Sequence, residues 1–238
     1  MVTGGAYTLF SSTASAETPS ASQATVQEGQ KLFATNCATC HGLSAQGTEN
    51  GPSLYGVGAA AVDFQVATGR MPLAMQGPQA VEKPVQFTDE QISALAAYVA
   101  SLAPGPAIPD EKYLAGDGDA AVGAELFRIN CAMCHNIAGA GGALTEGKSA
   151  PALTNVSARH VYEAMITGPQ SMPVFNDANL TPQQKADIIT ALKYTAENPS
   201  PGGFELGSLG PVSEGLFIWI FGLGAIVGVT IWLSARAN

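Results

Sequence analysis

The sequence predicts a mainly α-helical protein, made of two tandem domains of similar sequence followed by one transmembrane helix. Three observations predict it: an internal repeat, an amphipathic helical pattern that closes each copy of the repeat, and a long uncharged run near the C-terminus. A chain of 238 residues is long enough for two small domains. The expected boundaries are a first domain at 26–103, a linker at 104–119, a second domain at 120–197, a linker at 198–214 and a transmembrane helix at 215–234.

The internal repeat is clearest around the cysteines. Gly29–His41 has the sequence GQKLFATNCATCH and Gly123–His135 has GAELFRINCAMCH, so Gly, Leu-Phe, Asn and Cys-x-x-Cys-His keep the same offsets. Two downstream matches follow, Gly51–Leu54 with Ala150–Leu153, and Thr68–Pro72 with Gly168–Pro173. The spacing therefore predicts the same fold twice.

Each copy ends in a predicted helix. Thr88 and Thr181 are N-cap residues with Gln three positions later, the pattern of a capping box. The apolar stripes that follow are Ile92, Leu95, Val99 and Leu102 in the first copy and Ile188, Ile189 and Leu192 in the second. The segment Ala103–Asp119 between the copies is rich in Pro, Gly and Asp, as domain linkers are.

Glycines in the first helix of each copy predict how that helix meets the last one. We expect Gly29 and Gly123 to let the two helices pass close together. At the same crossings we expect Phe33 to meet Tyr98 and Phe127 to meet Tyr194. These contacts would be packing, with no chemistry implied.

The C-terminal run Gly215–Leu233 has 19 residues without a charge. As a helix it spans about 28 Å, close to the ~30 Å hydrocarbon core of a bilayer. Trp219 and Trp232 lie near its ends, where aromatic rings anchor at the headgroups. Glu214 precedes the run and Arg236 follows it, which predicts a single pass of the cell membrane with the two domains on the extracytoplasmic side.

The N-terminal segment 1–25 is predicted to be a tether. Residues 1–10 are weakly apolar and contain no basic residue, and Ala14–Ala16 resembles an A-x-A cleavage site. We interpret residues 1–10 as the end of a longer hydrophobic export signal or anchor; an ordinary disordered terminus is the alternative. Residues 11–25 are rich in Ser, Thr and Ala, which is typical of a flexible segment.

Composition excludes several classes of protein. The chain has 10 Lys and Arg against 19 Asp and Glu, a net charge of −9, which argues against a nucleic-acid binder. The hydrophobic content of 46% excludes disorder throughout. Four cysteines in two tight pairs are too few for a disulfide-stapled scaffold of this length.

Both cysteine motifs predict covalent attachment of haem c. In Cys-x-x-Cys-His the two thiols lie one helical turn apart, where both can add to the vinyl groups of one porphyrin edge, and the adjacent imidazole faces the iron. The expected thioether residues are Cys37, Cys40, Cys131 and Cys134, and the expected iron ligands are His41 and His135. A thioredoxin-like dithiol or one zinc ion shared by both pairs are the alternatives, but neither explains the histidines.

The second axial ligand of each iron is predicted to be methionine. Met71 and Met172 each precede Pro at matching positions, and a His/Met ligand pair is common in electron carriers. Met75 lies on the same loop as Met71 and remains an alternative.

Three other residues are not expected to bind iron. Met133 lies inside the attachment loop, and Met165 is predicted to be a core residue of a short helix that ends before Gly168. His160, next to Arg159, is expected to be a surface or structural residue.

Each ligand histidine needs an acceptor for its Nδ1–H group, because that hydrogen bond orients the ring. The matching positions in the two copies are Pro52 and Pro151, whose carbonyls we expect to accept from His41 and His135. The alternative is that both prolines only form turns.

These residues resemble a known family. The pattern Gly-x-x-Leu-Phe-x-x-x-Cys-x-x-Cys-His, the Gly-Pro-x-Leu segment and the Met-Pro loop resemble class I cytochrome c domains, twice. Residues 25–238, and above all Gly51–Leu54, Thr68–Pro72 and Thr167–Pro173, resemble the di-haem cytochrome c subunit of the actinobacterial cytochrome bcc complex, a menaquinol:cytochrome c reductase. Members of that family typically carry an N-terminal hydrophobic segment as well.

The resemblance implies a subunit of a proton-translocating respiratory complex that is not catalytic alone. One haem would take electrons from a Rieske iron–sulfur protein and the other would pass them to the copper centre of an aa-type cytochrome oxidase, with a cytochrome b subunit and the bilayer as further partners. The alternatives are the di-haem subunit of a cbb-type oxidase, a di-haem enzyme such as a peroxidase, and a structural zinc protein.

Overall fold

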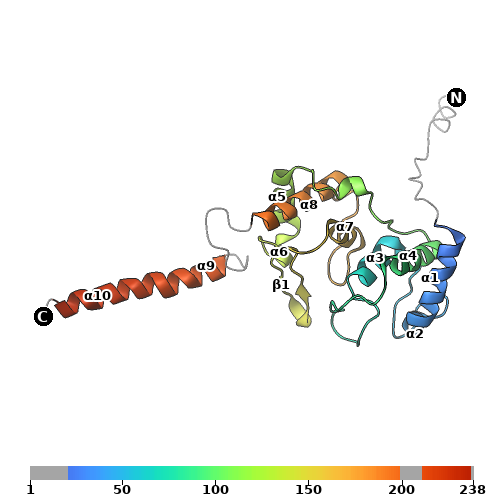
Figure 1. The fold of residues 1–238 in the computed structure, drawn as a ribbon, viewed down its shortest axis with the longest axis horizontal. Helices are drawn as coiled ribbons and strands as arrows, with labels where there is room; N and C mark the ends of the chain where they lie inside the picture. The colour runs from blue at the N-terminus through green and yellow to red at the C-terminus, as the bar shows by residue number, and fades with distance from the viewer. Residues whose placement is uncertain (1–20, 199–210, 237–238) are drawn as a thin grey trace, which may run out of the picture.

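The computed structural model describes residues 21–198 and 211–236, and these are largely helical (Figure 1). The first domain contains α1 (Gln23–Asn36), α2 (Ala38–His41), α3 (Gly58–Ala67) and α4 (Asp89–Leu102). The second contains α5 (Ala120–Asn130), α6 (Ala132–His135), the short strands β1 (Gly142–Ala143) and β2 (Ser149–Ala150), α7 (Ala158–Thr167) and α8 (Pro182–Glu197). The predicted mainly α-helical pair of similar domains is confirmed.

The predicted caps form. Thr88 accepts a hydrogen bond from the Gln91 amide and Thr181 accepts one from the Gln184 amide, and both capping boxes are complete. Ser22 caps α1 through the Thr25 amide, so residues 23–25 belong to a helix. The predicted tether is therefore wrong over these three residues, because a Ser N-cap starts the helix before the first apolar position.

In each domain the first and last helices cross at a glycine. A Cβ atom on Gly29 would overlap the carbonyl oxygen of Ala94, and one on Gly123 would overlap that of Asp187. The predicted role of both glycines is confirmed: the absence of a side chain lets the two backbones touch.

The aromatic contact predicted at these crossings forms in one domain only. The rings of Phe33 and Tyr98 lie 5.3 Å apart, centroid to centroid. Tyr194, however, is 61% exposed, and the prediction that it meets Phe127 is wrong. Counted from the two capping boxes, the residue equivalent to Tyr98 is Ala191, which is buried.

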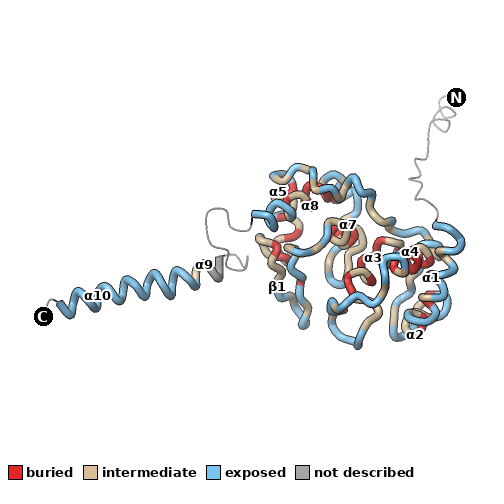
Figure 2. Tube along the Cα trace, in the orientation of Figure 1, coloured by how far each residue is buried: buried red, intermediate tan, exposed pale blue. Residues whose placement is uncertain are grey.

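Each domain has its own small hydrophobic core under its helix crossing (Figure 2). Buried residues of the first core include Phe33, Val66, Ile92, Leu95 and Val99. Those of the second include Phe127, Val161, Met165, Leu180, Ile188 and Ile189. The predicted apolar stripe of α4 supplies residues to the first core, and that of α8 supplies residues to the second.

The connection between the domains packs against both of them. The Pro106 carbonyl accepts a hydrogen bond from the Ala60 amide in the first domain, at 3.1 Å. Tyr113, in a short 3₁₀ helix (Glu111–Tyr113), stacks on Tyr162 of the second domain with centroids 6.0 Å apart. The linker is therefore held at both ends rather than free.

Two loops join the domains by hydrogen bonds. The Gln79 side chain donates to the Ser149 carbonyl and accepts from the Ser149 amide, both at 2.8 Å. The Ala80 amide donates to the Gln170 side chain at 3.2 Å. Gln79 and Ala80 follow Met71 in the chain and Gln170 precedes Met172, so the two methionine loops touch.

Helices α3 and α7 form the second part of the domain contact (Figure 1). Arg159 of α7 donates to the Asp63 carboxylate of α3 at 2.9 Å. His160 lies edge-on to Phe64, with ring centroids 6.2 Å apart. This contact was not predicted from the sequence.

The C-terminal segment is one continuous helical stretch, formed by α9 (Pro211–Phe217), a π-helical turn (Ile218–Leu223) and α10 (Gly224–Arg236). Its residues 214–236 are long and apolar enough to cross a membrane, with mean hydropathy 2.3. Figure 2 shows α10 exposed along its length, as expected of a helix whose apolar surface faces lipid.

Several predictions concern residues outside the described part of the chain. They are the export signal or anchor at 1–10, the cleavage-like Ala14–Ala16 and most of the linker at 198–214, since residues 1–20 and 199–210 are not described.

The helix crossing gives a direct test of the fold. We expect Gly29→Ala to destabilise the first domain by about 1–3 kcal/mol or more, because the new methyl group must displace the backbone of α4. Gly77→Ala is the matched control, since the atom nearest to the new Cβ would be the Gln79 carbonyl oxygen at 4.0 Å. Thermal unfolding of the purified protein measures both; equal melting temperatures for the two variants would contradict the close crossing.

Candidate haem-binding sites

The two cysteine motifs fold as the same short turn. In each domain the first helix ends at Asn, the first cysteine leaves helical geometry, and a four-residue helix begins directly after it. The His41 amide donates to the Cys37 carbonyl at 3.0 Å, and the His135 amide donates to the Cys131 carbonyl at 2.9 Å. One helical turn thus carries two thiols and an imidazole in both domains.

The imidazoles are oriented as expected. Nδ1 of His41 lies 2.7 Å from the Pro52 carbonyl oxygen, and Nδ1 of His135 lies 2.9 Å from that of Pro151. The tautomer that donates from Nδ1 leaves the Nε2 lone pair available to a metal ion. Among the described residues no side chain or backbone group bonds either Nε2 atom.

The loops that carry these prolines return to the motif by the same hydrogen bonds. In one pair of bonds, the amide of Gly47 donates to the carbonyl of His41, and the amide of Gly141 donates to that of His135. In the other pair, the amide of Leu54 donates to the carbonyl of Ala45, and the amide of Leu153 donates to that of Gly139. The proline is 11 residues after the histidine in the first loop and 16 residues after it in the second. The extra residues form the β1–β2 hairpin, which includes Ser149 at the domain contact.

The first cysteine of each pair packs against its core, with Cys37 partly buried and Cys131 buried. Burial, with a smaller effect from the neighbouring thiol, raises the pKa of Cys37 to about 11 and that of Cys131 to about 11. No disulfide bond joins any of the four cysteines. With pKa values this high, the thiols of Cys37 and Cys131 stay protonated at neutral pH, which is the state that adds across a vinyl group.

Met71 and Met75 differ in burial in the structure. Met71 is half-buried and packs against the first core, and its amide donates to the Gln65 carbonyl at 2.9 Å. Met75 is 78% exposed on the same loop. Met71 is therefore the methionine that lies at the edge of the core.

Met172 lies in an equivalent place in the second domain. It is half-buried against the second core, and the next turn is fixed by a 2.7 Å hydrogen bond from the Phe175 amide to the Met165 carbonyl. Further along, fully buried Lys185 bonds the Asp177 carboxylate at 2.7 Å. Met165 itself is 2% exposed in α7, as predicted for a core residue.

The other two residues predicted not to bind iron lie elsewhere. Met133 is 94% exposed between its cysteines. His160 lies in the contact between the domains, with its Nε2 atom 4.0 Å from the Asp63 carboxylate.

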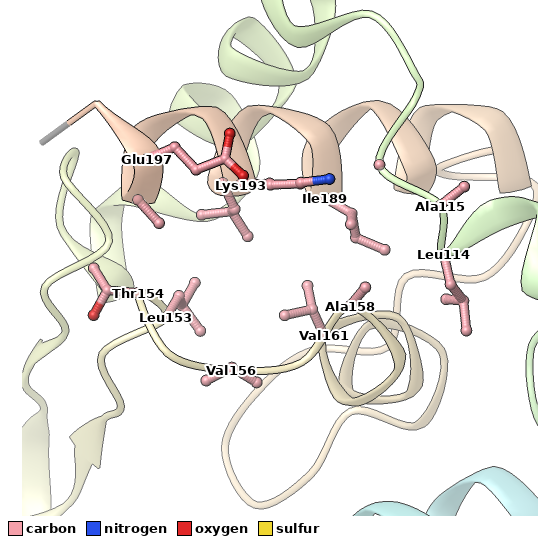
Figure 3. Close-up of a pocket in the computed structure, with 13 residues that line it drawn as sticks. Leu114, Ala115, Leu153, Thr154, Val156, Ala158, Val161, Ile189, Lys193 and Glu197 are labelled. Atoms are coloured by element: carbon pink, nitrogen blue, oxygen red, sulfur yellow. The ribbon is translucent and has the colours of Figure 1, made fainter.

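A cavity of about 360 Å³ lies in the second domain, between α7, α8 and the segment that follows Pro151 (Figure 3). Its walls are mainly aliphatic, and Leu153, Val161 and Ile189 point into it. Its size and lining suit a largely apolar ligand. Cys131, Cys134, His135 and Met172 are not among the residues that line it. In both domains, the two thiols and the free Nε2 atom of the attachment turn fit covalently attached haem.

Sequence reasoning missed the polar cluster at the domain contact, which includes Asp63 and Glu163. Glu163 is fully buried. Burial, and then the Asp63 carboxylate, raise the pKa of Glu163 to about 9, although Arg159 opposes the shift. The i, i+3 spacing of His160 and Glu163 on one helix was the only sequence signal, and Asp63 is far away in the chain.

A shared zinc site at the cysteines does not form. Among the described residues, the group of three or more His, Cys, Asp or Glu side chains close enough to hold a metal ion is Asp63, His160 and Glu163, and it contains no cysteine.

Family models match both domains. The model described as cytochrome c matches residues 26–103. The model described as cytochrome c oxidase, cbb3-type, subunit III matches residues 118–190.

Similar proteins cover most of the chain. The cytochrome bc1 complex cytochrome c subunit of Corynebacterium efficiens is 45% identical over 231 residues, covering 90% of this chain and 78% of that protein. The protein with the same name in Mycobacterium tuberculosis is 45% identical over 224 residues, covering 91% of this chain and 80% of the relative. The cbb3-type oxidase subunit FixP of Sinorhizobium medicae is 31% identical over 126 residues, or 49% of this chain and 41% of FixP.

Three findings point to the same family. They are the two domains with the same attachment turn, the apolar C-terminal helix, and the similarity to the relatives over most of the chain. The chain belongs to the family of cytochrome bc1 complex cytochrome c subunits, and its two cytochrome c domains bind haem c covalently.

Proposed function

We propose that this chain is the membrane-anchored electron relay of a quinol:cytochrome c reductase. It takes electrons from a Rieske iron–sulfur protein and passes them to the copper centre of an aa-type cytochrome oxidase, in a complex with a cytochrome b subunit. The complex as a whole oxidises quinol and translocates protons, and this chain has no catalytic activity alone. The names of the relatives support the bc1 complex as its setting.

The observation that carries this proposal is the contact between the two haem domains. The methionine loop of the first domain bonds to Ser149 of the β1–β2 hairpin through Gln79, and to Gln170 of the second methionine loop through Ala80. Helix α3 is joined to α7 by the ion pair between Asp63 and Arg159. Because electron tunnelling falls steeply with distance, a relay needs its two centres at a fixed separation. Contacts between loops of the two domains and between two helices supply that constraint.

We assign the haem-binding residues by domain. Cys37 and Cys40, and Cys131 and Cys134, form the thioethers. His41 and Met71 ligate the first iron, and His135 and Met172 the second. Pro52 and Pro151 orient the histidines through their carbonyls. Bound haem c supplies reversible one-electron exchange at iron, and a thioether ligand raises its potential.

The chain's own residues keep each site suited to outer-sphere electron transfer. Met71 and Met172, packed at the edges of the two cores, would hold the remaining ligand position of each iron, so that no substrate could bind there. The backbone bonds of the attachment turn and the bond from each histidine to its proline would hold the ligands in place in both oxidation states, which would lower the reorganisation required for electron transfer.

The C-terminal helix anchors the relay. Residues 214–236 cross the cell membrane, with Arg236 on the cytoplasmic side and both haem domains on the extracytoplasmic side. An anchored pair of domains stays beside its partners and replaces a diffusing cytochrome c.

The subunit of a cbb-type oxidase is the second candidate, because a cbb3-type model matches residues 118–190. FixP, however, matches about half of this chain, whereas the bc1 subunits match about nine-tenths of it. This difference in coverage favours the bc1 complex. A di-haem peroxidase would need an open iron position, which Met71 and Met172 would not leave as iron ligands.

The ligand assignment is tested by removing one thioether at a time. We expect Met71→Leu to open one iron, so that the reduced protein binds carbon monoxide at one haem per chain, and Met172→Leu to do the same in the second domain. Met75→Leu is the matched control and should bind none. Carbon monoxide difference spectra measure all three; binding by Met75→Leu but not by Met71→Leu would reverse the assignment.

The assignment of the chain to a respiratory complex is tested by isolation and turnover. Purification of the tagged full chain in mild detergent should recover a cytochrome b, a Rieske protein and an aa-type oxidase together. In that preparation Met71→His and Met172→His should each slow electron flow from quinol to oxygen by tenfold or more, because a His/His site has a lower potential. A chain that always isolates alone, or unchanged flow in both variants, would contradict the proposal.

A further inference from the structure

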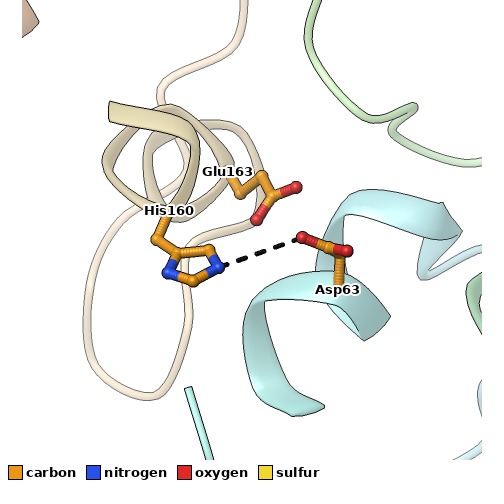
Figure 4. Close-up of side chains that lie close together, drawn as sticks. All are labelled: Asp63, His160 and Glu163. Atoms are coloured by element: carbon orange, nitrogen blue, oxygen red, sulfur yellow. Dashed lines mark ion pairs between the residues drawn. The ribbon is translucent and has the colours of Figure 1, made fainter. Parts of the chain in front are cut away.

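A second metal-ligand set lies at the contact between the two haem domains. Asp63 projects from α3, and His160 and Glu163 project from α7 toward it (Figure 4). His160 and Glu163 are three residues apart, so they share one face of their helix. The ligand atoms of the three side chains all lie within 4.8 Å of one another.

Arg159 holds one oxygen of each carboxylate and leaves the other free. Its Nη2 donates to Asp63 Oδ1 at 2.9 Å, and its Nε donates to Glu163 Oε1 at 3.3 Å. Asp63 Oδ2 lies 4.0 Å from His160 Nε2, too far for a hydrogen bond. Arg159 thus orients both carboxylates, as residues that hydrogen-bond to metal ligands do around a metal ion.

Glu163 supplies an independent indication of a ligand. Its side chain is 0% exposed, and its Oε2 atom has no hydrogen-bond partner. A buried polar atom without a partner is costly, and such atoms are rare in folded proteins.

The donor set identifies the kind of cation. One imidazole and two carboxylate oxygens suit zinc and related first-row divalent ions, which bind such atoms at about 2.0–2.2 Å. The chain has three histidines, and the other two, His41 and His135, belong to the attachment motifs. We infer that Asp63, His160 and Glu163 bind one divalent transition-metal ion, represented experimentally by Zn²⁺, which bridges the two haem domains.

Bringing the ligands onto one ion needs only a small closing movement. Ligand atoms around tetrahedral zinc are about 3.4 Å apart, whereas the three ligand atoms here lie within 4.8 Å of one another, with 4.0 Å between Asp63 Oδ2 and His160 Nε2. Water would complete the coordination from the side of His160, whose side chain is 21% exposed. The ion lies outside both electron-transfer sites, and its effect is to hold α3 against α7.

Zinc binding is measured on the full-length chain carrying both haems, purified with a chelator and dialysed against Zn²⁺. Metal analysis should find one zinc per chain beside two irons. Because the ion binds only the docked domains, a hundredfold excess over its dissociation constant should raise the melting temperature by about 5–10 °C. X-ray absorption at the zinc edge should show nitrogen and oxygen ligands without sulfur.

Variants separate this site from adventitious binding. Glu163→Gln keeps the shape of the side chain and His160→Ala removes the imidazole, and each should weaken zinc binding by at least about tenfold and abolish the thermal shift. Glu146→Gln, at an acid with a 78% exposed side chain, is the control and should leave both unchanged. The visible haem spectrum reports whether each variant has folded. Absence of zinc in the parent protein, equal uptake by all variants, or sulfur ligands at the zinc edge would each overturn the inference.

Discussion

One turn of helix determines the organisation of each domain. In Cys-x-x-Cys-His the backbone bond from the histidine amide to the first cysteine carbonyl sets the positions of two thiols and one imidazole together. The ring is then fixed by a proline carbonyl, which requires the following loop to return to the motif. Domains of about 80 residues bury too little surface to be strongly stable alone, so a large apolar group attached at this turn is part of the core.

The two domains share this turn and differ where they meet. The longer loop of the second domain forms the β1–β2 hairpin, and Ser149 of that hairpin bonds Gln79 of the first domain. Helix α7 adds Arg159, which holds Asp63 of α3. The repeat thus provides two equivalent haem sites, and the residues that depart from it join them into a pair.

Local patterns made much of this architecture predictable. Capping boxes, glycines at the crossings and the histidine–proline pairs are short-range signals, and each one has the predicted geometry. The contact of Asp63 with Arg159 joins residues 96 positions apart and has no local signature. The predicted contact of Tyr194 with Phe127 was wrong because Tyr194 was paired with Tyr98 by residue type, whereas the number of residues from the N-cap pairs Tyr98 with Ala191. The position of Met71 before proline favoured it over Met75, and the structure adds that Met71 packs against the core whereas Met75 is exposed.

The central claim is that each cysteine pair holds its own haem by covalent bonds, and intact mass under denaturing conditions measures this directly. The native chain should exceed its polypeptide mass by two haems. The double variant Cys37→Ala/Cys40→Ala should exceed its polypeptide mass by one haem, and so should Cys131→Ala/Cys134→Ala. A native chain with the bare polypeptide mass, or double variants that still carry two haems, would contradict the account.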